Sequence, residues 1–146
     1  MSIEYACAMG HAPGIVAWAA AAPTDQRERL YGAFAELRRR LDNARLDTLI
    51  VLTAEHWANF FLDHMSAFCI GVADHFSGPI EPWLKIDKAR IECDQSLAHE
   101  ILDACYAREL ELSFARELQF DHGTMIPLHF LTPGMNVPVV PRPATK

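Results

Sequence analysis

The sequence lacks any C-x-x-C pair, and its cysteines are widely spaced at Cys7, Cys69, Cys93 and Cys105. It also lacks a basic, apolar leader, so we expect a cytoplasmic protein with reduced thiols. Basic residues are few: 13 Lys and Arg against 19 Asp and Glu give a net charge of −6, which argues against a nucleic-acid partner. The longest apolar run, residues 14–23, is too short to cross a bilayer, which argues against a membrane partner.

The remaining composition is that of an ordinary globular domain. The chain has 146 residues, of which 51% are hydrophobic and 22% are charged, and a chain of this size can bury a core. Apolar runs typical of strands alternate with amphipathic helical stretches, which is typical of an α/β fold. We therefore predict a single α/β domain over residues 1–146, with a central, mostly parallel or mixed sheet flanked by helices.

The predicted elements can be placed along the chain from their patterns. The strand candidates are residues 3–9, 47–53, 68–73 and 137–140, and the helix candidates are residues 24–44 and 94–110. The continuous apolar run at 47–53 predicts a strand covered on both faces. Residues 111–120 fit a strand or a helix, and residues 74–90 resemble a long binding loop or an irregular surface segment.

The proline-rich end of the chain predicts an exposed edge strand, because proline lacks a backbone N–H. Nothing in the sequence after residue 140 is long enough to cover this strand. We therefore expect a homo-oligomer or a partner chain.

Three histidines stand in similar local contexts. His11 follows the first strand candidate in M-G-H-A-P-G, His56 follows the second in A-E-H-W, and His122 lies in D-H-G-T. Ligands gather at the carboxyl ends of parallel strands, so His11 and His56 emerge side by side if their strands are neighbours. Two imidazoles suit a divalent first-row metal, although each histidine also fits a simple turn. The other histidines look structural: His64, His75, His99 and His129.

The order of these motifs resembles the class III extradiol ring-cleavage dioxygenases, the family of protocatechuate 4,5-dioxygenase and 2,3-dihydroxyphenylpropionate dioxygenase. The set is G-H-A-P, A-E-H-x-x-x-F-F, F-C-I-G, D-H-G-T-x-x-P-L and V-P-V-V-P, spread over residues 11–140. The resemblance implies a non-haem Fe(II) bound by His11 and His56. It also implies an active-site acid/base at His122, with Asp121 beside it in the catalytic motif.

The same resemblance implies the reaction and its partners. The expected activity is extradiol cleavage of a catechol-type aromatic compound with O₂, in aromatic compound catabolism. Phe60 and Phe61 match the family's aromatic pair after the second ligand, and Pro127 matches the proline after Asp-His-Gly. These three residues are the candidate substrate contacts.

The chain departs from the family pattern in two respects. Glu55 stands where the family commonly has Asp. Family chains are also much longer, and their third ligand, a Glu, and a second active-site histidine lie in a C-terminal half that has no counterpart here. The chain is thus expected to be a truncated catalytic-type domain, and the carboxylate would come from a partner chain or from Asp63, Asp74 or Glu81, none of which is favoured.

Two further functions stay open at this point. One is a catalytically incomplete relative of the same fold that serves in binding or assembly. The other is a hydrolase with Zn(II) on the same histidines, where a metal-activated water is the nucleophile.

Overall fold

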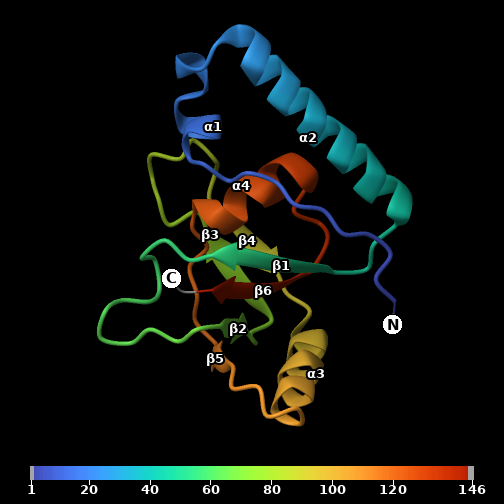
Figure 1. Cartoon of the computed structure of the whole chain (residues 1–146), viewed down its shortest axis with the longest axis vertical. Helices are drawn as coiled ribbons and strands as arrows, with labels where there is room; N and C mark the ends of the chain where they lie inside the picture. Colours follow the sequence, from blue (N-terminus) through green and yellow to red (C-terminus); the bar gives the residue numbers. More distant parts are fainter. Residues whose placement is uncertain (1, 145–146) are drawn as a thin grey trace.

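Parallel strands lie side by side at the centre of the molecule. The computed structural model describes residues 2–144. It pairs β1 (Leu49–Ala54) with β6 (Val139–Ala144), and β2 (Cys69–Gly71) with β5 (Ser113–Ala115), both in parallel (Figure 1). β6 also lies against β2, where an isolated bridge joins residues 68 and 144. Together with the helices, this confirms the predicted α/β fold.

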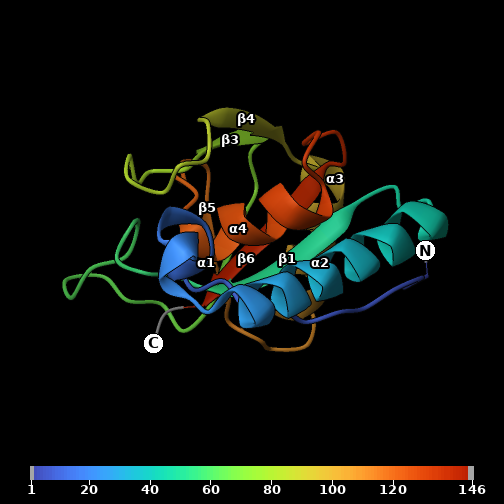
Figure 2. The ribbon, with the colours of Figure 1, turned by 90° about the horizontal axis from the view of Figure 1, so that it is seen from above.

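Helices cover this layer of strands on both faces. α2 and α4 lie on one side and α3 on the other (Figure 1), and α4 runs between α2 and the β3–β4 hairpin (Figure 2). The helices are α1 (Gly14–Ala17), a short 3₁₀ turn at Ala19–Ala21, α2 (Thr24–Ala44), α3 (Gln95–Tyr106) and α4 (His122–Leu131). α3 begins as predicted at Asp94, whose Oδ1 accepts the backbone N–H of Leu97 at 2.9 Å. Among the described residues, no helix is long and apolar enough to cross a membrane.

The core is divided by the strands into two clusters. Val139 packs with Met125 of α4 in the larger cluster, whereas its neighbour Val140 packs with Ile70 and Leu102 in the smaller cluster beneath α3. Successive side chains of a strand point to opposite faces, so β6 is buried from both sides. α2 joins the larger cluster through Phe34 and Phe130, whose ring centroids are 4.8 Å apart.

The long loop predicted at residues 74–90 is an irregular connection flanked by the two strands of a hairpin. β3 (His75–Gly78) and β4 (Ala89–Glu92) pair in antiparallel fashion, and only the connection between them, residues 79–88, is irregular. Within the ambiguous stretch 111–120, residues 113–115 form β5. The strand alternative was therefore correct there, because these residues pair with β2.

The predicted strand at residues 3–9 is wrong. The described residues 2–12 contain no helix and no strand. An apolar composition favours a strand, but a strand also requires a neighbour that completes its ladder of hydrogen bonds.

The prediction that residues 47–53 are covered on both faces is also wrong. Ile50 and Leu52 of β1 are 48% and 65% exposed. In the β1–β6 register they stand opposite Val140 and Arg142, on the face that α3 covers. α3 contacts β2 and β6 and leaves this part of β1 open.

The last strand pairs with β1 alone within its two-stranded sheet, as an edge strand does, but it is buried rather than exposed as predicted. Leu49 N–H donates to the Pro138 carbonyl and Glu55 N–H to the Ala144 carbonyl, both at 2.9 Å. The backbone hydrogen-bonding groups of the even-numbered residues of β6 therefore point toward β1. Pro141 and Pro143 therefore place their missing N–H groups on the opposite side, toward β2. β6 keeps its ladder with β1 and meets β2 by packing, so the prolines stand on the side of β6 that needs no ladder of hydrogen bonds.

Candidate metal centre

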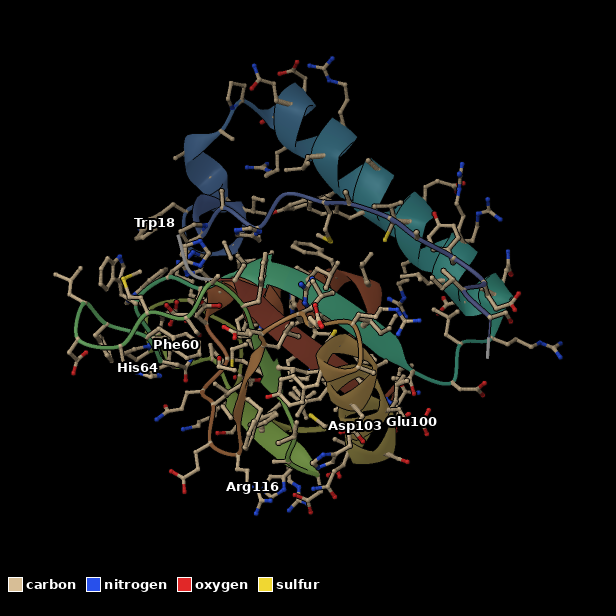
Figure 3. All side chains as sticks on the ribbon, turned by 60° about the horizontal axis from the view of Figure 1, so that its bottom comes forward. Trp18, Phe60, His64, Glu100, Asp103 and Arg116 are labelled. Carbon is tan, nitrogen blue, oxygen red and sulfur yellow. The ribbon has the colours of Figure 1, made fainter. Side chains whose placement is uncertain are left out.

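Three imidazole rings meet beyond the carboxyl end of β1. The ring centroids of His56 and His122 are 4.1 Å apart, and the His11 ring lies 5.1 Å from His56 and 6.2 Å from His122. The structure thus brings together the three histidines that the motifs singled out, although no strand precedes His11. Figure 3 shows Trp18 and Phe60 on one side of the molecule, away from Glu100 and Asp103 of α3.

His56 is placed by a tight turn that follows β1. The Glu55 carboxylate accepts the backbone N–H groups of residues 57–59, which folds the chain back at this point. The Asn59 side chain then bonds twice to the backbone of Gln119, at 2.7 and 3.0 Å. Glu55 therefore shapes the turn, and its oxygens are used there rather than at the histidines.

A carboxylate holds the His56 ring from behind. Asp121 Oδ2 lies 2.9 Å from His56 Nδ1 and also accepts the backbone N–H of His56 at 2.9 Å. Asp121 occupies the N-cap position of α4 but makes no side-chain cap hydrogen bond there, although aspartate is a preferred cap. A carboxylate oxygen that already accepts the N–H is an acceptor for Nδ1–H as well. The contact thereby favours the His56 tautomer that carries its proton on Nδ1 and leaves the lone pair on Nε2.

His122 is held in the same way by a different acid. Glu81 Oε1 lies 2.7 Å from His122 Nδ1 and 3.1 Å from its backbone nitrogen, which donates to it. The connection that carries Glu81 is anchored next to α4, because the Ile80 N–H donates to the Phe120 carbonyl at 2.9 Å. Both side chains of the pair are largely buried, with 12% of His122 and 14% of Glu81 exposed.

The N-terminal segment contributes the third histidine and a tryptophan that lies beside the cluster. Tyr31 of α2 donates its hydroxyl proton to the Ile15 carbonyl at 2.6 Å, which ties α1, just after His11, to α2. Trp18 stacks on Trp83, with ring centroids 5.4 Å apart and planes 18° apart. The Trp83 ring lies 6.3 Å from that of His122, so indole rings border the histidines.

The closest set of potential ligand atoms comes from His56, Asp121 and His122, within 4.8 Å of one another. Asp121 contacts the Nδ1 side of His56, however, whereas an ion on Nε2 would lie across the ring. Metal-bound histidines commonly donate their other N–H to such a carboxylate. Asp121 therefore suits an orienting role, and the clustered imidazoles suit the ligand role.

The other candidates named from the sequence lie in various places. Phe60 is buried in the larger core cluster, whereas Phe61 is 51% exposed. Pro127 lies inside α4 and is half-buried. Asp74 is exposed and contacts His75. Trp18 was missed altogether, since no motif contains it, and Glu81 carried no local signal that set it apart from other acids.

Parallel strands with histidines and carboxylates gathered beyond their carboxyl ends define an α/β protein with a candidate metal centre. The chain belongs to the family described as the catalytic LigB subunit of aromatic ring-opening dioxygenase, which matches residues 5–144. This confirms the resemblance that the motifs indicated.

Several curated relatives carry the name 2,3-dihydroxyphenylpropionate/2,3-dihydroxicinnamic acid 1,2-dioxygenase. One from Klebsiella pneumoniae (strain 342) is 28% identical over 115 residues, which is 78% of this chain and 35% of the relative. One from Dechloromonas aromatica (strain RCB), whose name ends in 1,2-dioxygenase 2, is 27% identical over 110 residues. This is 75% of this chain and 33% of the relative. One from Rhodococcus globerulus is 23% identical over 109 residues, which is 75% of this chain and 33% of the relative. The chain thus spans about a third of the length of these relatives.

Proposed function

We propose that this chain takes part in the extradiol cleavage of a catecholic aromatic compound by O₂, with Fe(II) bound at His11 and His56. The observation that carries the proposal is the meeting of three imidazoles, two of them held by carboxylates through Nδ1. The family description names an aromatic ring-opening dioxygenase and so supports ring cleavage as the reaction, and the relatives' names support a dioxygenase.

The donor set fits a divalent first-row metal. Neutral imidazole nitrogens are common ligands for Fe(II), and the Asp121 carboxylate holds His56 with Nε2 available. Bound there, Fe(II) would supply open coordination positions at which a catechol and O₂ exchange electrons. A further carboxylate, from a second chain or from beyond the matched third of the relatives, would complete a two-histidine, one-carboxylate set.

His122 is the residue we assign to proton transfer. Its Nδ1 faces Glu81, so the lone pair on Nε2 is the site that accepts a proton from a catechol hydroxyl and later returns it. An imidazole can accept a proton at one nitrogen and later give it back, which suits this exchange. The indole of Trp83 beside His122 offers an apolar face for an aromatic ring.

Oxygen uptake tests the proposal directly. The purified chain is reconstituted anaerobically with Fe(II) and ascorbate, then mixed with protocatechuate, gallate or 2,3-dihydroxyphenylpropionate in an oxygen-electrode cell. We expect uptake that requires iron, a catechol and His56, together with a ring-fission chromophore. A folded chain that binds no Fe(II) would contradict the proposal and favour a binding or assembly role. Iron binding without uptake would contradict activity of this chain alone.

Replacing His122 by alanine is expected to slow turnover by about 10²–10⁴-fold, the usual contribution of a general acid or base. Iron content should stay within about twofold of wild type, because in the proposed arrangement His122 transfers a proton and does not bind the metal. The measurement is oxygen uptake at saturating catechol, paired with iron analysis of the same sample. Equal loss of iron and activity would instead make His122 a ligand.

Replacing Asp121 by asparagine is expected to weaken Fe(II) binding by about tenfold, because a neutral amide accepts the His56 Nδ1–H less strongly than a carboxylate. Isothermal titration of the metal measures the change. Asp74→Asn is the matched control, since Asp74 contacts a histidine Nδ1 at 2.7 Å on the exposed surface. An Asp121→Asn variant with wild-type metal affinity and slow turnover would place Asp121 in the chemistry rather than behind His56.

A further inference from the structure

Glu81 is the acid whose position the sequence did not explain. It lies in the connection between β3 and β4, and its Oε1 contacts both the Nδ1 and the backbone N–H of His122. This repeats the two contacts that Asp121 makes to His56. Two histidines of one cluster are thus each fixed by a carboxylate that binds ring and backbone together.

The burial of the Glu81 carboxylate is not explained by a gain in stability. Its second oxygen, Oε2, is buried and makes no hydrogen bond to the described residues. Burying an unsatisfied acceptor is unfavourable, and an apolar side chain in the same place would avoid this cost. What the carboxylate gains is its pair of contacts with His122.

We propose that Glu81 is a positioning residue that fixes His122 as the Nδ1–H tautomer and turns its Nε2 toward the other two histidines. The backbone N–H of His122 is a donor at every pH, so Glu81 Oε1 is the acceptor, and it accepts the Nδ1 proton in the same way. Without Glu81 the His122 ring can rotate, or it can carry its proton on Nε2. An Nε2 that already carries a proton cannot accept another from a substrate. The tautomer follows from the contacts alone, and only its effect on turnover rests on the proposed function.

The geometry favours this role over metal ligation by Glu81. Its Oε1 is used on the Nδ1 side of His122, and the set of ligand atoms within 4.8 Å of one another includes His56, Asp121 and His122 but not Glu81. An acid that orients a histidine ring contacts its Nδ1, as Glu81 does for His122 and Asp121 does for His56.

Nitrogen NMR of the histidine side chains tests the tautomer without any catalytic activity. The ¹⁵N-labelled, metal-free chain is compared with Glu81→Gln and Glu81→Ala, and His122→Asn assigns the His122 signals. We expect a protonated Nδ1 on His122 in the wild type, the same in Glu81→Gln, whose amide oxygen can still accept, and loss of this preference in Glu81→Ala. Asp74→Ala is the matched control, and it should change only the signals of His75.

Turnover gives a second readout where the loaded chain consumes O₂. Glu81→Ala is expected to lower kcat by about 10–100-fold, as for other partners that orient a functional histidine, with KM and iron content within about twofold. Glu81→Gln should recover most of this loss.

Two results would overturn the inference. One is a wild-type His122 protonated on Nε2, and the other is a Glu81→Ala spectrum in which His122 is unchanged. If Glu81→Ala does not fold, the wild-type spectrum and that of Glu81→Gln decide. A correct tautomer in a chain that binds no iron would contradict the proposed function and leave the positioning role standing.

Discussion

Replacing His56 by alanine is expected to lower the Fe(II) affinity of the chain by more than about 100-fold, beyond the 10–100-fold typical of losing an outer partner. His56 stands at the centre of the cluster, since its ring is close to both His11 and His122. Asp121 already holds its Nδ1 side, so its Nε2 is oriented before any metal binds. Removing the ring therefore removes a prearranged ligand of the proposed site and leaves the buried Asp121, which is 4% exposed, with only the backbone N–H of residue 56 of its two contacts there.

Iron analysis after anaerobic reconstitution measures this loss, and circular dichroism checks that the variant is folded. His11→Ala should behave like His56→Ala, because both supply a ligand in the proposed site. His99→Ala is the control, since His99 is a half-buried residue of α3, on the far face of the strands. Unchanged iron content in His56→Ala would contradict the ligand assignment.

The positions of His56 and His122 could be predicted from the sequence because both residues stand where local patterns place the end of a strand or the start of a helix. His56 follows a clear apolar strand, and His122 begins a helix in the Asp-His-Gly motif. Residues at the ends of strands and helices have predictable positions once the elements are placed. His11 reached the cluster for another reason, since α1 behind it is fastened to α2 by Tyr31.

The carboxylate partners could not be assigned from the sequence in the same way. Asp121 adjoins His122 in the chain but contacts His56, which is 65 residues away. Glu81 contacts His122 across 41 residues, through a connection that a backbone hydrogen bond between Ile80 and Phe120 helps to anchor. Such contacts depend on tertiary packing, for which neither periodicity nor motif spacing gives a signal.

The errors in the predicted fold have a related physical cause. Proline in the last strand suggested an exposed edge, but the missing N–H groups of Pro141 and Pro143 matter only on one side of β6, and β1 pairs on the other. The apolar run of β1 suggested burial on both faces, but α3 is too far along the sheet to cover Ile50 and Leu52. Composition reports how apolar an element is, and the neighbours decide which face is covered.

Replacing Gly123 by alanine is expected to destabilise the fold and the metal site together. A Cβ built at Gly123 would lie 2.8 Å from the Ala54 carbonyl oxygen, 2.8 Å from Thr53 Oγ1 and 3.0 Å from Asp121 Oδ1. The Ala54 carbonyl belongs to the end of β1 and cannot rotate aside as a side chain would. The start of α4 must therefore move away from β1, at a cost of about 1–3 kcal/mol for overpacking. This explains why glycine follows His122 in the Asp-His-Gly motif.

The same movement separates His56, which follows β1, from Asp121, which precedes α4, so we expect weaker Fe(II) binding in addition to a fall in Tm of about 4–12 °C. Thermal unfolding and iron analysis measure the two effects. Gly32→Ala is the matched control: its Cβ meets nothing within 4 Å, and alanine favours the α2 helix by up to about 1 kcal/mol, so Tm should hold or rise. A Gly123→Ala variant with wild-type Tm and iron content would contradict the close contact between α4 and β1 on which the position of His56 depends.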